Sequence, residues 1–156
     1  SVTTLAKAAS TGASGAFIGI TATSSKVLNT NHTEALVSGS TVNTTGAFGV
    51  SAINTTSQNA NASGNAGGVV AAGANDARAI SDTLTTAKIG AMDSFNSGDV
   101  NVTANGTDTN VAVVVSGSGG VVAGSAADGH TSSTSVTEAL LGTGTALTVA
   151  STGKVS

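Results

Sequence analysis

The chain contains no cysteine, proline, tryptophan or tyrosine among its 156 residues, and only three phenylalanines and one methionine. Without cysteine it can form neither a disulfide framework nor a cysteine-ligated metal site. Charged residues make up 8% of the sequence, against roughly a quarter in ordinary soluble domains. Because large apolar side chains must offset the conformational entropy lost on folding, so few of them argue against an ordinary globular core.

Long apolar runs and strong net charge are missing as well. The longest apolar run, Val111–Val115, is far shorter than the ~18 residues of a membrane span, so no membrane span is expected. The net charge is −3 and the mean hydropathy is +0.26, which does not match the high charge and low hydropathy of disordered chains. Valine, threonine, alanine, glycine, serine and asparagine dominate instead. This composition indicates strands of small and β-branched residues joined by polar turns.

The sequence repeats itself with a period of 52 residues. Thr33–Val37 has counterparts at Thr85–Ile89 and Thr137–Leu141, and three such periods make up the 156 residues. The chain thus divides into repeats 1–52, 53–104 and 105–156 without an insertion or deletion. A period of this size is typical of arrays in which each unit buries its face against the next.

Within a repeat the apolar residues alternate with period two, as in Val100–Ala104 and in Ala146–Val149. This alternation predicts strands. The sequence therefore predicts an all-β fold, a parallel β-solenoid of three 52-residue repeats. Each repeat is either one broad flattened coil or two coils of about 26 residues, which would differ in axial rise. We expect the glycine- and serine-rich segments 10–15, 63–68 and 116–120 to be turns, and 76–80 and 128–132 to be loops.

Four sets of residues spaced by 52 are expected to stack as core columns. The adjacent pair Val69–Val70 further predicts a strand that is covered on both faces. The columns are Phe17/Val69/Val121, Val37/Ile89/Leu141, Ala35/Ala87/Ala139 and Val50/Val102/Lys154, the last with a discordant lysine.

The segment Thr137–Gly142, followed by Ala146–Val149 and Gly153–Ser156, resembles the repeat of large bacterial surface adhesins, the leukotoxin-like and filamentous-haemagglutinin-like exoproteins. Asp99–Ala104 is similar to the second half of that repeat. The resemblance extends over all three repeats. It implies a β-solenoid within a long exported protein, and it brings no catalytic residues.

No pattern in the sequence predicts catalysis, a cofactor or a metal site, and we expect no enzyme. Lys26, Arg78 and His130 form a basic column that is interpreted as solvated, and His32 lies in a different column. Asp76, Asp128 and Asp99 lack the glycine-aspartate repeat of calcium-binding solenoids, so they are interpreted as turn residues. Six Asn-x-Ser/Thr sequons occur, at Asn31, Asn43, Asn54, Asn61, Asn101 and Asn105. Two threonine columns, Thr3/Thr55/Thr107 and Thr33/Thr85/Thr137, suggest hydroxyl ladders in preference to an ice-binding array.

The functional hypothesis is a structural shaft of an extracellular or cell-surface filament or giant adhesin, which associates with itself. The alternative is a surface-binding solenoid that presents a flat Thr/Ser-rich face to ice or glycan. We expect the protein's partner to be another copy or its own continuation, with a host or neighbouring cell surface as a further candidate and no nucleic acid. The end-to-end contact is predicted at Ser1, Val2, Thr3, Val155 and Ser156, either within a longer polypeptide or between stacked subunits.

Overall fold

The computed structural model describes residues 1–91, 94–142 and 148–149, and every regular element among them is a β-strand. Long strands follow from the alternating small and β-branched residues, which suit a pleated surface with one buried face. The elements are β1 (Val2–Gly15), β2 (Ile18–Val37), β3 (Thr41–Asn43), β4 (Phe48–Gly67), β5 (Val70–Ile89), β6 (Ser94–Ser97), β7 (Val100–Gly119), β8 (Val122–Leu141) and β9 (Thr148–Val149).

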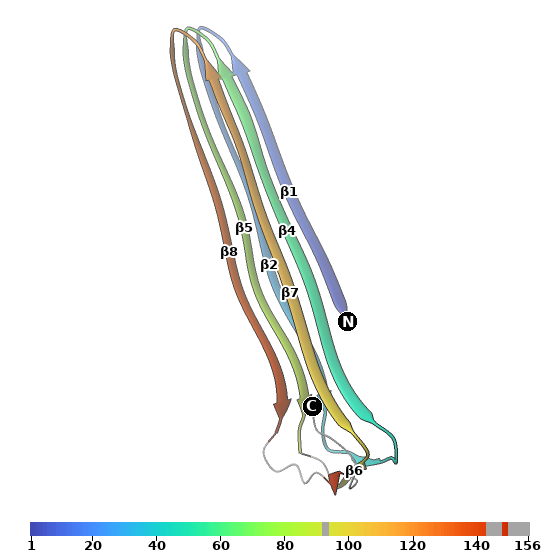
Figure 1. The fold of residues 1–156 in the computed structure, drawn as a ribbon. Helices are drawn as coiled ribbons and strands as arrows, with labels where there is room; N and C mark the ends of the chain where they lie inside the picture. Colours follow the sequence, from blue (N-terminus) through green and yellow to red (C-terminus); the bar gives the residue numbers. More distant parts are fainter. Residues whose placement is uncertain (92–93, 143–147, 150–156) are drawn as a thin grey trace.

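The strands form three parallel sheets, and each sheet contains one strand from each 52-residue repeat (Figure 1). Sheet A has the order β1-β4-β7, sheet B has β2-β5-β8, and a short third sheet has β3-β6-β9. In sheets A and B each residue pairs with the residue 52 positions further on, so Thr33 pairs with Thr85 and Thr85 with Thr137. The fold is a parallel β-solenoid in which one repeat makes one broad, flattened rung.

The register shifts by one residue in the short third sheet. Thr41 pairs with Ser94 and Val42 with Phe95, a separation of 53 residues. The separation returns to 52 where Phe48 pairs with Val100. The strict 52-residue period of the sequence therefore conceals a local offset between the first two rungs.

Sheets A and B pack face to face along their length (Figure 1). Their buried positions alternate: even-numbered residues of β4 and odd-numbered residues of β5 point inward. Between the two sheets, β4 packs against both β2 and β5, whereas β8, which pairs with β5 in its own sheet, packs across only against β7 to any extent. Since β8 has so little cover, all its residues are exposed.

Two apolar clusters lie in the interior, one with several larger side chains and the other mainly of alanine. One cluster, near β6, gathers Val50, Ala52, Ala87, Ile89, Phe95, Val100 and Val102. Phe95 also meets Phe48 edge-on, with ring centroids 5.1 Å apart. The second cluster contains Val27 and the alanines 60, 62, 77 and 79. Alanine and valine allow the two sheets to approach closely, so dispersion between many small groups replaces the few large side chains of a usual core.

Polar side chains fill the interior between these clusters. Asn54, Thr56 and Gln58 are at most 1% exposed. In the amide orientation that satisfies its neighbours, Gln58 accepts a hydrogen bond from Asn29 Nδ2 (2.9 Å) and donates one to Asp108 Oδ1 (2.9 Å). Such pairing offsets the cost of removing these polar groups from water. The interior is thus partly a hydrogen-bonded layer.

The turns between sheets A and B stack so closely that they require glycine. A Cβ on Gly68 would collide with the backbone carbonyl of Ala16 in the rung before it, and a Cβ on Gly120 would collide with the carbonyl of Gly68. Ala16, in the first rung, occupies the same place in the repeat. At this position of the repeat, a residue with a Cβ therefore fits only in a rung whose turn is not stacked directly on the same turn of a preceding rung.

Several sequence-based expectations are wrong. Phe17, Val69 and Val121 are 72%, 41% and 86% exposed, because they lie at the turn, beyond the region where the two sheets cover each other. Val70 is also exposed, so the Val69–Val70 pair is not covered on both faces. The predicted loops at 76–80 and 128–132 lie within β5 and β8, since ladder pairing to the adjacent rungs overrides their local turn preference. The glycine- and serine-rich segments are mostly strand and turn only at their ends.

None of the described residues forms a helix long and apolar enough to cross a membrane.

Candidate functional site

Asp108 is the centre of a hydrogen-bonded cluster between the two sheets. Its Oδ1 accepts a hydrogen bond from Thr56 Oγ1 (2.6 Å), and its Oδ2 accepts from Ser81 Oγ and from Ser133 Oγ (2.5 Å). Ser135 Oγ lies 3.4 Å from Oδ2. One carboxylate on β7 thus joins β4 within its own sheet to β5 and β8 of the opposite sheet.

The pKa of Asp108 reflects two opposing influences. Burial raises the pKa of the carboxyl, but the hydrogen bonds from Ser133, Ser81, Thr56 and Ser135 lower it further than burial raises it, so it lies below its ordinary value. Hydroxyl donors favour the charged form because a carboxylate is the better acceptor. Through these hydrogen bonds the carboxylate links strands of both sheets.

The sequence carried a signal for this cluster that the sequence analysis missed. Asp108 aligns with Thr4 and Thr56, so an acid replaces threonine in an inward-facing column. The serines that bind it, Ser81 and Ser133, occupy one column of the opposite sheet. Recognising the pairing requires knowing which columns face each other, and a 52-residue period does not contain that information.

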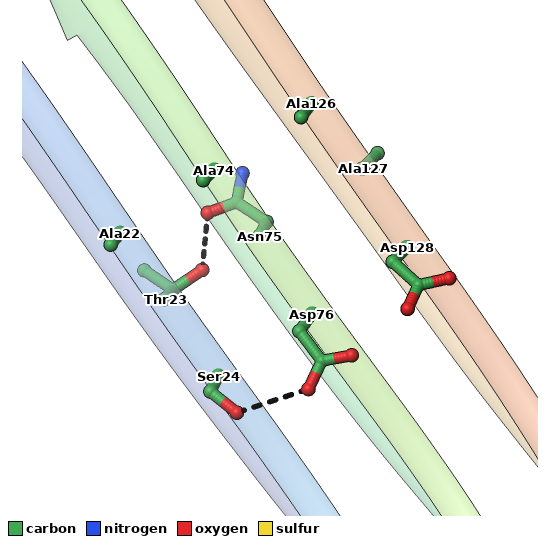
Figure 2. Close-up of a pocket in the computed structure, with 9 residues that line it drawn as sticks. All are labelled: Ala22, Thr23, Ser24, Ala74, Asn75, Asp76, Ala126, Ala127 and Asp128. Atoms are coloured by element: carbon green, nitrogen blue, oxygen red, sulfur yellow. Dashed lines mark hydrogen bonds between the residues drawn. The ribbon is translucent and has the colours of Figure 1, made fainter.

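The outer face of sheet B carries a shallow groove of about 480 Å³. Ala22, Ala74 and Ala126 line up along one side of it, and Ser24, Asp76 and Asp128 along the other (Figure 2). Thr23, Asn75 and Ala127 lie between the two rows. Most of the groove surface is apolar, so it suits an apolar side chain with a charged group beside it.

The basic column lies next to this groove. Arg78 Nε donates to Asp76 Oδ1 at 3.1 Å, and its Nη2 lies 3.9 Å from Asp128 Oδ2. The hydrogen bond and charge of Asp76 raise the pKa of the exposed Arg78. The column of Ser24, Asp76 and Asp128 and the basic column therefore run side by side on one exposed surface. Lys26 and His130 are the members of the basic column in the first and third rungs.

The two threonine columns lie in different environments. Thr3, Thr55 and Thr107 are exposed on the outer face of sheet A. Thr33 and Thr85 are 7% and 1% exposed, because odd-numbered residues of β2 and β5 point into the interior. Only one of the columns can therefore contribute to a flat polar surface, and the ice- or glycan-binding alternative loses half of its proposed array.

The predicted stacking columns vary in burial from rung to rung. Ala87 and Ile89 are fully buried, Ala35 and Val37 are partly buried against the same cluster, and Ala139 and Leu141 in the third rung are exposed. Val50 and Val102 are buried.

The residues of the predicted end-to-end contact are described only in part. Ser1 precedes β1, and Val2 and Thr3 begin it. Val155 and Ser156, like Lys154 of the fourth column, lie outside the described residues.

The sequons differ greatly in accessibility. Asn54 is 1% exposed and binds Asn31 Nδ2 through its Oδ1 (3.0 Å). Asn61, Asn101 and Asn105 are exposed. Among the described residues, no three acidic or histidine side chains come together in a way that could hold a metal ion.

No protein-family model, curated protein or solved structure matches this chain.

Proposed function

We propose that this chain is a structural shaft segment of an extracellular filament or giant adhesin, and that its rungs continue by pairing with further rungs of the same kind. The observation that carries the proposal is the open ladder. Within the described residues, β1 and β2 pair only with the second rung, and β7 and β8 likewise. Unpaired strand edges readily add another strand. Such a segment would give the filament its length and would resist unfolding.

The direction of the backbone groups supports this continuation. Val122 and Gly142 donate their N–H groups to the carbonyls of Val69 (3.0 Å) and Ile89 (2.7 Å) in the preceding rung. Because successive N–H groups of a strand point to opposite sides, the odd-numbered residues of β8, including Thr131, direct theirs away from β5. A further rung would find a row of donors and acceptors along β8.

Side-chain columns favour a rung like the first one as the next rung. In 52-residue register, Leu141 would stack on Val37, Ala139 on Ala35 and Thr137 on Thr33 of the added rung. The third-rung members, which are exposed here, would then be covered as Ile89 and Ala87 are. Covering apolar surface at about 25 cal/mol per Å² favours the addition.

One contact opposes a perfect fit. Ala16 of the added rung would direct its Cβ at the carbonyl of Gly120, just as a Cβ on Gly68 would meet the carbonyl of Ala16. Continuation therefore requires a displaced turn at this position, while the long strands stay in register.

Electron microscopy and fibre diffraction of the purified chain test the proposal. We expect unbranched filaments with a reflection near 4.8 Å along the axis, the spacing between paired strands. Thr131→Pro should abolish assembly, because it removes a donor from the open edge and from no pair within the chain. Thr131→Ala keeps the N–H and serves as the matched control. If Thr131→Pro folded normally and assembled as well as Thr131→Ala, the proposal would be refuted.

A further inference from the structure

The outer face of sheet B is divided into columns of distinct character. The acid column is Ser24, Asp76 and Asp128, and the basic column beside it is Lys26, Arg78 and His130. The alanine column Ala22/Ala74/Ala126 forms the groove on one side of this pair. On the other side, at the same distance in the sequence, Leu28 and Ile80 form a ridge, and Leu28 is 61% exposed.

We propose that this face binds the same face of a second copy, related by a two-fold axis that runs parallel to the rung stacking, between the acid and basic columns. Such an axis keeps the rungs level and reverses the strand direction. A two-fold interface must be self-complementary, with residue i opposite residue j and j opposite i. The four central columns of sheet B meet this condition in charge and in shape, whereas in the next column outward Asp82 would face Ala72.

Charge complementarity follows from the position of the axis. Asp76 would face Arg78 of the second copy, and Asp128 would face its His130. The guanidinium group of Arg78 has five N–H donors, so it can keep its bond to Asp76 in the same chain and still pair across the interface. Each copy contributes both signs of charge, so the arrangement places no like charges opposite each other in these columns.

Shape complementarity follows from the same axis. Leu28 would lie over Ala22 of the second copy, and Ile80 over its Ala74, so the exposed ridge enters the alanine groove. Further out, Val70 would face Leu84, and Val122 would face Val136. Val122 and Val136 are both exposed in the single chain, and this pairing would cover them.

The area is sufficient for a stable contact. Columns 18 to 32 across three rungs cover a surface of about 14 Å by about 50 Å, or roughly 700 Å² per copy at ordinary strand spacings. Standard protein–protein interfaces bury about 800 Å² per partner. Sheets packed face to face in this way usually lie within about 30° of each other.

This lateral contact does not depend on the shaft proposal, and the two differ in symmetry. End-to-end continuation forms open-ended polymers, whose average mass grows with protein concentration. The two-fold contact is closed and gives a dimer. Lateral pairing would double the shaft without lengthening it.

Sedimentation equilibrium distinguishes these cases, with Ala74→Arg as the interface variant and Asn61→Arg as its control. Both residues are exposed on the middle strand of their sheet, but Asn61 faces outward from sheet A. At concentrations below those at which the ends associate, we expect the native chain and Asn61→Arg to dimerise and Ala74→Arg to lose at least tenfold in affinity. Circular dichroism confirms that each variant is folded.

A charge exchange provides a second test. Asp76→Arg alone should weaken the dimer, because two arginines then meet across the axis, and the double variant Asp76→Arg/Arg78→Asp should restore it. A native chain that stays monomeric would assign the groove to another kind of partner and overturn the proposal. Open-ended polymers that Ala74→Arg leaves unchanged would also overturn it, while supporting the shaft. Failure of the double variant to restore the dimer would overturn the proposed register.

Discussion

Ile89 and Leu141 occupy the same column in successive rungs, and the structure predicts very different costs for truncating them. Ile89 is fully buried, whereas Leu141 is 48% exposed. Replacing a fully buried isoleucine by alanine leaves a cavity and costs about 2–5 kcal/mol. Leu141 has only about half of its transfer free energy to lose, roughly 1 kcal/mol, and leaves no enclosed cavity. We therefore expect Ile89→Ala to destabilise the chain by at least twice as much as Leu141→Ala.

Urea unfolding followed by circular dichroism measures both free energies, at a protein concentration where the chain is monomeric. Equal m-values for the two variants would show that only stability has changed. A Leu141→Ala cost equal to that of Ile89→Ala in the monomer would contradict the assignment of β8 as the uncovered rung. At concentrations where the ends associate, the Leu141→Ala cost should rise, because an added rung would bury this side chain.

Three further changes have defined outcomes. Because the folded-state pKa of Asp108 is lowered, its contribution to stability is present above the unfolded-state pKa and lost as the pH falls through the folded-state value. Asp108→Asn should therefore flatten this acid dependence in urea melts, and an unchanged acid dependence would contradict the role given to this carboxylate. Gly68→Ala should lower the melting temperature by several degrees, since its Cβ meets a backbone carbonyl, whereas Gly124→Ala, with open space around it, should have little effect. Ala16→Gly should lower the concentration needed for end-to-end assembly, as measured by light scattering, and no change would mean that Ala16 of the added rung does not approach the carbonyl of Gly120.

The repeat could be read from the sequence because of how parallel strands stack. When residue i lies directly over residue i+52, each position experiences nearly the same surroundings in every rung, so similar residue types recur at that interval. The choice between one coil and two per repeat could not be made in this way. It depends on where the chain reverses, and the turns fall at Ala16-Phe17 and Gly68-Val69, just beyond the serine- and glycine-rich segments that were expected to form them.

Assigning the inside and outside of each strand from sequence failed where apolar residues lie outside the region of sheet overlap. Phe17 is the largest side chain of its column and is 72% exposed, although its apolarity predicted burial. Thr33 and Thr85, polar residues, point inward. In this chain burial is decided by strand parity and by the extent of sheet overlap, because the interior accepts alanine, threonine and asparagine alike.

The polar interior has a consequence for register. Much of the apolar packing is alanine on alanine, as at Ala60, Ala62, Ala77 and Ala79, and a strand that slipped by two residues would keep its inward parity and still bury small side chains. Such packing alone distinguishes poorly between registers. The same slip would move Asp108 away from its serine and threonine donors and leave a partly buried carboxylate without these partners, which is unfavourable. The hydrogen-bonded residues between the sheets therefore give the rungs a unique alignment, which the small apolar residues around them stabilise but do not specify.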